Sequence, residues 1–141
     1  MLSDTPSSSP DPDVPCMLYA ARVHAGFPSP ADDFIDKALD LNEHLIAHPA
    51  ATFFVKVQGD SMIDAGIHPG ALLVVDRSLQ PRSGSIILAI LDGEFTVKRL
   101  KKDKGQVILC PENPRYAPVT VMPGQDFEVW GVVRHVIRSF I

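Results

Sequence analysis

The 141-residue chain has few of the features that commonly reveal where a protein works. It has only two cysteines, Cys16 and Cys110, without a Cys-x-x-Cys spacing, which argues against a disulfide scaffold and a structural zinc site. No apolar run reaches the ~20 residues that a membrane span requires. The first 15 residues lack the basic-then-apolar pattern of a secretion signal. We therefore expect a cytoplasmic protein that does not contact a membrane.

Sequence signals for a bound cofactor are missing as well. The chain has neither a Gly-x-Gly-x-x-Gly pattern nor a Walker sequence, so nucleotide binding has no support. His44 and His48 are four residues apart and could share a metal on a helix, but no third ligand is evident. We expect neither a cofactor nor a metal ion.

Charge is unevenly distributed along the chain, whose formal net charge is −4. Residues 1–50 carry eight acids and only two bases. The basic side chains are concentrated in one stretch, which contains Lys98, Arg99, Lys101, Lys102 and Lys104. This stretch is either a nucleic-acid contact or a hairpin end flanked by solvated lysines. The net negative charge of the whole chain favours the hairpin end, because a nucleic-acid-binding protein usually has a broad basic surface.

An arm and one helix are predicted before the body of the protein. Residues 1–15 are rich in Ser, Pro and Asp and hold too little apolar area to offset the entropy of ordering, which predicts a mobile arm. Ser29 can cap a helix that has Pro30 at its first position and ends before Pro49. Its apolar stripe consists of Phe34, Ala38, Leu41 and Leu45.

Short strands are predicted for the rest of the chain, giving a mainly β fold. The β-branched and aromatic runs, separated by glycines, are 52–57, 71–75, 85–91, 94–100, 106–110 and 127–137. Asp92 and Gly93 lie between two of these runs, and this pair is a strong signal for a two-residue hairpin.

A candidate nucleophile lies directly after the first of these strands, in Gly59-Asp60-Ser61-Met62. A serine on a turn at a strand end is exposed, and the neighbouring glycine allows a substrate to approach the backbone closely. The backbone N–H groups of Ser61 and Met62 could then stabilise an oxyanion. Taken alone, the pattern also fits a serine that only caps a turn.

Lys98 is the candidate general base. It shares one face of its predicted strand with Thr96 and Leu100, neighbours able to desolvate it. A lysine with an ordinary pKa of ~10.4 is neutral in only roughly one molecule in 2500 at pH 7, but burial lowers that pKa by up to ~3–5 units. Serine–lysine pairs are a known nucleophile–base arrangement. The alternative is a lysine that extends its charge to solvent from an edge strand.

Several blocks of sequence, in the same order, resemble the LexA/UmuD family of self-cleaving serine–lysine peptidases. The blocks are residues 25–30, 54–67, 92–100, 111–116 and 131–133. The resemblance implies that Ser61 is the nucleophile, Lys98 the base and Ala25-Gly26 the scissile bond. It also implies the C-terminal β-rich peptidase domain of that family, with one short helix. Residues 1–25 would form the flexible arm that self-cleavage removes, and 26–141 the peptidase and dimerisation domain.

The same resemblance implies partners. UmuD-type members are homodimers whose self-cleavage is stimulated by RecA on single-stranded DNA. The shortened dimer joins a UmuC-like, error-prone DNA polymerase subunit for translesion synthesis in the SOS response. Only 25 residues precede Gly26, too few for the winged helix-turn-helix of a LexA-type repressor, so we expect no sequence-specific DNA binding.

The sequence leaves two other interpretations open. In the first, the protein is a non-catalytic dimeric accessory or regulatory subunit that retains Ser61 and Lys98 without using them. In the second, it is a relative of signal peptidases, which also use serine and lysine. That second interpretation requires a membrane anchor, for which the sequence gives no signal.

Overall fold

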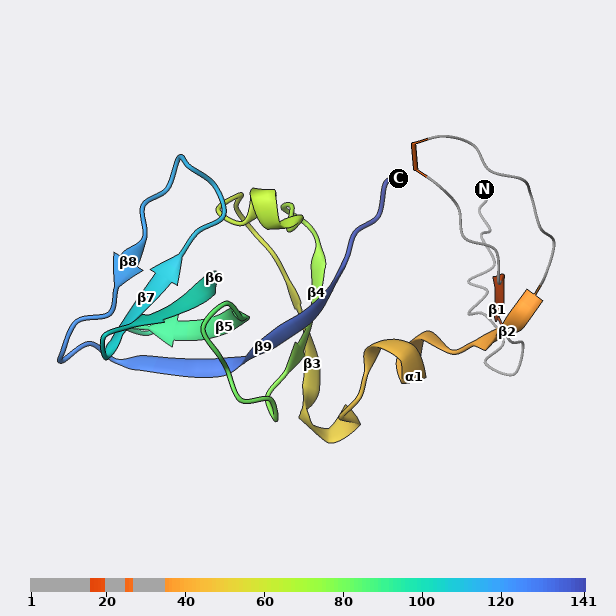
Figure 1. Cartoon of the computed structure of the whole chain (residues 1–141), viewed down its shortest axis with the longest axis horizontal. Coiled ribbons are helices and arrows are strands. Elements are labelled where there is room, and N and C mark those ends of the chain that lie inside the picture. Colours follow the sequence, from red (N-terminus) through yellow and green to blue (C-terminus); the bar gives the residue numbers. More distant parts are fainter. Residues whose placement is uncertain (1–15, 20–24, 27–34) are drawn as a thin grey trace, which may run out of the picture. The chain divides into compact units, whose positions relative to one another are not determined.

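The computed structural model describes residues 16–19, 25–26 and 35–141. The chain forms two compact units, residues 1–44 and 45–141 (Figure 1). No helix in the described residues is long and apolar enough to span a membrane.

The first unit contains a two-stranded antiparallel sheet. Strand β1 (Cys16–Tyr19) pairs with β2 (Ile35–Leu39), with an irregular register between Leu18 and Tyr19. Helix α1 (Leu41–Leu45) follows at once, and Asp40 caps it by accepting a hydrogen bond from the Asn42 N–H at 2.9 Å.

The single helix predicted between Ser29 and Pro49 is therefore wrong over Ile35–Leu39 and confirmed only over Leu41–Leu45. Its predicted cap lies outside the described residues. An apolar residue at every third or fourth position favoured a helix locally. Pairing of β2 with β1, a segment distant in sequence, overrides that local preference.

The second unit is a seven-stranded antiparallel sheet, which confirms the mainly β fold. Its strands are β3 (Thr52–Lys56), β4 (Leu72–Asp76), β5 (Ile86–Leu91), β6 (Glu94–Asp103), β7 (Gln106–Cys110), β8 (Val119–Thr120) and β9 (Phe127–Ile137). The strand order is β3-β4-β9-β5-β6-β7-β8. Two short 3₁₀ turns, η1 (Pro49–Ala51) and η2 (Ile63–Ala65), complete the unit. Each of the six predicted strands is present, whereas β8 was not predicted.

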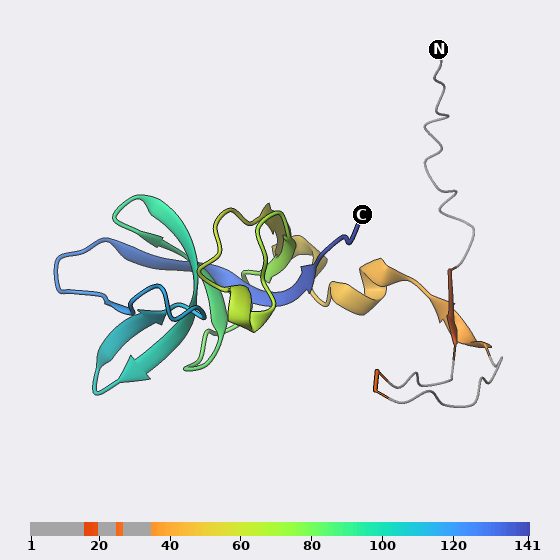
Figure 2. The same ribbon diagram turned by 90° about the horizontal axis from the view of Figure 1, so that it is seen from above.

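Strand β9 joins the two halves of this sheet. It pairs with β4 through residues 132–137 and with β5 through residues 127–132. Figures 1 and 2 show it running along both groups of strands. Where β9 passes β4, a Cβ on Gly131 would lie 2.6 Å from the side-chain atom Val75 Cγ1 and 3.2 Å from the Asp76 carbonyl oxygen. A side chain at Gly131 would therefore force its neighbours to shift.

Two hairpins place strand β6 next to its neighbours. Asp92 and Gly93 have φ angles of 50° and 84° and connect β5 to β6, as predicted from the sequence. Lys104 and Gly105, with φ angles of 49° and 80°, make a second turn of this kind between β6 and β7. Strand β6 is longer than predicted and includes all of the basic stretch except Lys104, which lies in the turn. Lys101, Lys102 and Lys104 are exposed near this hairpin end.

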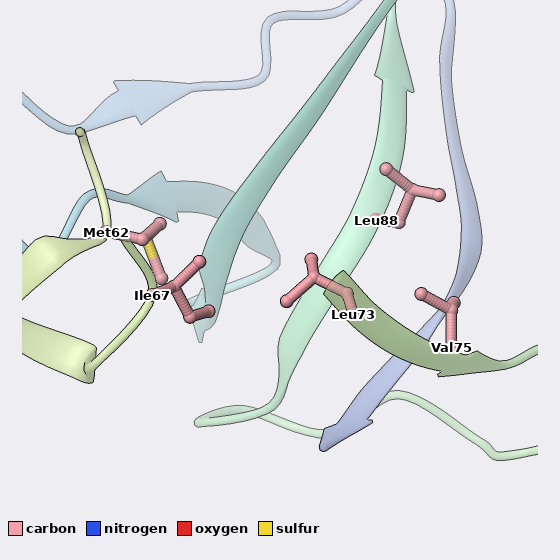
Figure 3. Close-up of a cluster of buried hydrophobic side chains, with 5 residues drawn as sticks. All are labelled: Met62, Ile67, Leu73, Val75 and Leu88. Carbon is pink, nitrogen blue, oxygen red and sulfur yellow. The ribbon is translucent and has the colours of Figure 1, made fainter. Parts of the chain in front are cut away.

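The hydrophobic core reaches the segment that carries Ser61. One buried cluster consists of Met62, Ile67, Leu73, Val75 and Leu88 (Figure 3). Met62 is 3% exposed and Ile67 is 2% exposed, and both come from the segment between β3 and β4. A second cluster, Ile87, Ala89, Leu100 and Leu109, lies between β5, β6 and β7. The residue that follows Ser61 is thus fixed in the core, which restricts the position of Ser61 itself.

Candidate active site

Ser61 and Lys98 lie within hydrogen-bond distance of each other. Lys98 Nζ donates to Ser61 Oγ at 3.0 Å, although the two residues are 37 positions apart. Ser61 belongs to the turn after β3, and Lys98 to the middle of β6. The structure thus brings together the two side chains that the sequence singled out.

Lys98 has two further hydrogen-bond partners. Its Nζ donates to Thr96 Oγ1 at 2.9 Å and to the Val97 carbonyl oxygen at 3.1 Å. Both partners belong to the same strand as Lys98, and Thr96 shares its face. No carboxylate of the described residues forms an ion pair with Lys98. Burial lowers the pKa of Lys98 below its ordinary value, because desolvation disfavours the charged form.

The turn that carries Ser61 has a backbone that depends on glycine. Gly59 has a φ of +82°, in the left-handed region that side chains rarely adopt. The chain then enters η2, which ends at Gly66 with a φ of 86°. The backbone N–H groups of Ser61 and Met62 donate to no described residue. Their role as donors to an oxyanion stays a prediction.

The loop between β7 and β8 supports this turn through hydrogen bonds. The Glu112 N–H donates to the Ser61 carbonyl oxygen at 2.8 Å, and Asn113 Nδ2 donates to the Asp60 carbonyl oxygen at 2.9 Å. The Tyr116 hydroxyl donates to Asp60 Oδ1 at 2.5 Å, and this contact raises the pKa of Tyr116. Sequence reasoning recognised residues 111–116 only as one matching block, and nothing in their spacing indicated that they hold the Ser61 turn.

A cleft of about 350 Å³ opens beside the Ser61–Lys98 pair. It is bordered by the end of β3 and by the segment of β6 from Phe95 to Lys98. Phe95 is 60% exposed, and its ring stands edge-on to Trp130 with the centroids 5.5 Å apart. Because β3 is the outermost strand of the sheet, its backbone groups on that side have no strand partner in the sheet. The cleft therefore combines an apolar wall, a free strand edge and the Ser61 hydroxyl.

The predicted scissile pair lies in the other unit. Ala25 and Gly26 are both exposed and form part of a bend. They belong to residues 1–44, whereas Ser61 and Lys98 belong to residues 45–141. Cleavage between Ala25 and Gly26 thus stays a prediction.

One of the two histidines considered for metal binding, His48, contacts a buried acid in the structure. His48 Nδ1 hydrogen-bonds to Asp76 Oδ2 at 2.6 Å, and Asp76 is fully buried. Within the described residues, no group of three or more His, Cys, Asp or Glu is arranged to hold a metal ion. Sequence reasoning missed the contact between His48 and Asp76, because the two residues are 28 positions apart.

Comparison with known proteins gives consistent matches. Residues 17–134 match the family described as Peptidase S24-like. Protein SamA of Salmonella typhimurium is 49% identical over 122 residues, covering 86% of this chain and 84% of that protein. Protein MucA of Escherichia coli is 45% identical over 84% of this chain and 81% of its own length. The LexA repressor of Paracidovorax citrulli is 42% identical over 84% of this chain, but only over 52% of its own length.

Proposed function

This chain belongs to the Peptidase S24-like family, as the resemblance found in its sequence predicted, and we propose that it is a serine endopeptidase that cuts its own backbone between Ala25 and Gly26. The observation that carries the proposal is the 3.0 Å contact between Lys98 Nζ and Ser61 Oγ inside a cleft. A nucleophile and a base within hydrogen-bond distance are the minimum that acyl transfer requires.

The three partners of Lys98 suit an amine that acts as a base. A neutral lysine has two N–H groups and one lone pair. The Val97 carbonyl oxygen can only accept a hydrogen bond, and Thr96 Oγ1 can accept one as well. When both are satisfied by the two N–H groups, the lone pair is left for the Ser61 hydroxyl. Burial favours this neutral form by lowering the pKa of Lys98.

The proposed reaction has four steps. Lys98 takes the proton of the Ser61 hydroxyl while the oxygen attacks the Ala25 carbonyl carbon. The N–H groups of Ser61 and Met62 stabilise the resulting oxyanion. Lys98 then returns the proton to the leaving amine of Gly26, which breaks the peptide bond. Water, activated by Lys98, finally hydrolyses the ester on Ser61 and releases residues 1–25.

The segment around the cut suits the cleft. Ala25 and Gly26 are small, so the carbonyl can approach Ser61 without a bulky side chain in the way. Pro28 and Pro30 favour an extended backbone for the residues before them. An extended segment can pair with the free edge of β3, which borders the cleft.

The biological setting that we propose is SOS mutagenesis in the bacterial cytoplasm. Similarity to proteins SamA, ImpA and MucA over most of the chain supports a UmuD-type protein. In this proposal the protein is a homodimer, and RecA on single-stranded DNA stimulates its cleavage. The shortened dimer, residues 26–141, then acts with a UmuC-like, error-prone polymerase subunit in translesion synthesis.

Self-cleavage of the purified chain at about pH 10 tests the enzymatic part of the proposal, because more of Lys98 is neutral there. The unchanged chain should be cut, and Ser61→Ala and Lys98→Ala should stay intact. Lys98→Arg should also stay intact, since arginine does not lose its proton. Lys101→Ala, an exposed lysine on the same strand, is the matched control and should be cut normally. A folded unchanged chain that stays whole would instead support the non-catalytic accessory subunit.

A further inference from the structure

One glutamate holds the chain on both sides of Met62. The Glu112 N–H donates to the Ser61 carbonyl oxygen at 2.8 Å, and the Glu112 carbonyl oxygen accepts from the Asp64 N–H at 2.8 Å. These bonds attach the Ser61 turn to the segment after β7. The geometry of Ser61 therefore depends on where Glu112 is held.

Arg99 fixes the side chain of Glu112. Arg99 Nε donates to Glu112 Oε1, and Arg99 Nη1 donates to the Gly84 carbonyl oxygen at 2.6 Å. The side chains of Arg99 and Glu112 are 38% and 32% exposed. Arg99 thus connects β6 with the loop before β5 and with the segment that is hydrogen-bonded to the Ser61 turn.

Strand β6 consequently holds both partners of the Ser61–Lys98 contact. Lys98 and Arg99 are adjacent, so their side chains leave the strand on opposite faces. Lys98 reaches Ser61 directly, whereas Arg99 reaches it through Glu112. We infer that the Arg99–Glu112 ion pair is a positioning device that sets the place of Ser61 Oγ relative to Lys98 Nζ. This inference rests on the proposed function, since it assigns the pair a role in that reaction.

Loss of the Arg99–Glu112 ion pair should lower the self-cleavage rate much more than it lowers the global stability of the protein. A partly exposed ion pair contributes little to global stability. Misplacing a reacting atom by about 1 Å, in contrast, can lower a rate about a hundredfold. A positioning role therefore predicts slow cleavage in a protein that is still folded. A merely structural role predicts a lower melting temperature with an unchanged rate in the folded protein.

The test uses the full chain with Arg99→Met and Glu112→Met, each alone and both together, because methionine has a similar length and cannot form the hydrogen bond between the two side chains. Lys101→Met is the matched control, because Lys101 lies on the same face of β6 as Arg99, and its exposed side chain forms no ion pair with the described residues. Three quantities are measured: the self-cleavage rate from about pH 6 to pH 10, the rate at which diisopropyl fluorophosphate labels Ser61, and the melting temperature. The labelling rate reports the nucleophile without requiring the arm to enter the cleft.

Each single variant should lower the maximal cleavage rate and the labelling rate about tenfold or more. The midpoint of the pH profile should stay close to that of the unchanged chain, because the burial that lowers the pKa of Lys98 is retained. The double variant should be no slower than either single variant, since both remove the same contact. The control should behave like the unchanged chain.

Cleavage and labelling within about twofold of the unchanged chain, in folded variants, would overturn the inference and leave the proposed function standing. A pH midpoint that shifts while the maximal rate stays the same would also overturn it, because the pair would then act on the pKa of Lys98 and not on the position of Ser61. An unchanged chain that neither cuts itself nor reacts with the reagent would overturn the proposed function, and this inference with it. If Arg99→Met does not fold, Glu112→Met gives the same decision, since the backbone bonds of residue 112 to the Ser61 turn are retained.

Discussion

At the scale of single residues, three groups around one amine nitrogen account for the chemistry that we propose. Lys98 Nζ has Ser61 Oγ, Thr96 Oγ1 and the Val97 carbonyl oxygen at 3.0, 2.9 and 3.1 Å. Sequence reasoning identified Ser61 and Lys98 from their motifs, and it placed Thr96 on the same face only as a neighbour able to desolvate Lys98. Only the three-dimensional arrangement shows that Thr96 restrains the amine.

Thr96→Val tests that restraint with a side chain of similar shape that lacks the hydroxyl. One N–H of Lys98 loses its acceptor, so the lone pair is no longer directed at Ser61. We expect self-cleavage to slow about tenfold or more in a protein that remains folded. Thr96→Ser, which keeps the hydroxyl, should restore most of the rate. Equal rates for Thr96→Val and the unchanged chain would show that Thr96 does not orient the amine.

The pH dependence of cleavage should reflect the lowered pKa of Lys98. The rate should rise with pH as the neutral fraction grows, and it should level off below the value of ~10.4 expected for an ordinary lysine. Single-turnover cleavage rates between about pH 6 and pH 11 give the midpoint. A rate that does not change over this range, with chemistry rate-limiting, would contradict the general-base role of Lys98.

At the scale of elements, the strands were predictable and the segments between them were less so. Runs of β-branched and aromatic residues predicted six strands, because such side chains fit the pleated surface of a sheet. The strand predicted over residues 94–100 ended too early, because the exposed residues of β6 after Leu100 have no apolar periodicity. The residues that support Ser61, such as Glu112 and Asn113, act through backbone and long-range contacts, which leave no local pattern.

The end of β4 carries a buried acid that should make stability depend on pH. Burial alone would raise the pKa of Asp76, but hydrogen bonds from Ser78 and His48 outweigh it and lower the pKa to about 2. The unfolded chain therefore binds this proton more readily than the folded chain. The stabilisation is complete above about pH 4 and is lost as the pH falls towards 2.

Asp76→Asn tests this pH dependence in urea unfolding experiments. The variant should be clearly less stable than the unchanged chain at pH 6, and the gap should narrow as the pH falls from about 4 to 2. Asp103→Asn, an exposed acid, is the control and should show little difference at either pH. A difference in the free energy of unfolding between Asp76→Asn and the unchanged chain that stays constant down to pH 2 would contradict the lowered pKa of Asp76.

The close contact between β9 and β4 leads to a second prediction at the scale of elements. Gly131→Ala would place a methyl group 2.6 Å from Val75 Cγ1, and Val75 is fully buried. We expect a loss of about 1–3 kcal/mol in the free energy of unfolding. Val75→Ala removes that methyl carbon, so the double variant should lose less than the sum of the two single losses. Additive losses would show that the Val75 contact does not limit this position.

At the scale of the whole molecule, the proposal requires an arm, a body and a second copy of the chain. Exposed apolar side chains gather at the C-terminal end, where Val136, Ile137 and Phe140 are 39%, 41% and 90% exposed. Cover by a second copy would bury them. Sedimentation equilibrium at micromolar concentration should give the dimer mass for the full chain and for residues 26–141. A monomer mass for both would contradict the homodimer.

Intact mass measurement after incubation with RecA filaments on single-stranded DNA tests the central claim most directly. The claim is that Ser61, with Lys98 as its base, cuts the bond between Ala25 and Gly26 of its own chain. The account predicts two products, residues 1–25 and 26–141, from the unchanged protein, and no products from Ser61→Ala under the same conditions. Cleavage at another bond, or equal cleavage of Ser61→Ala, would contradict it.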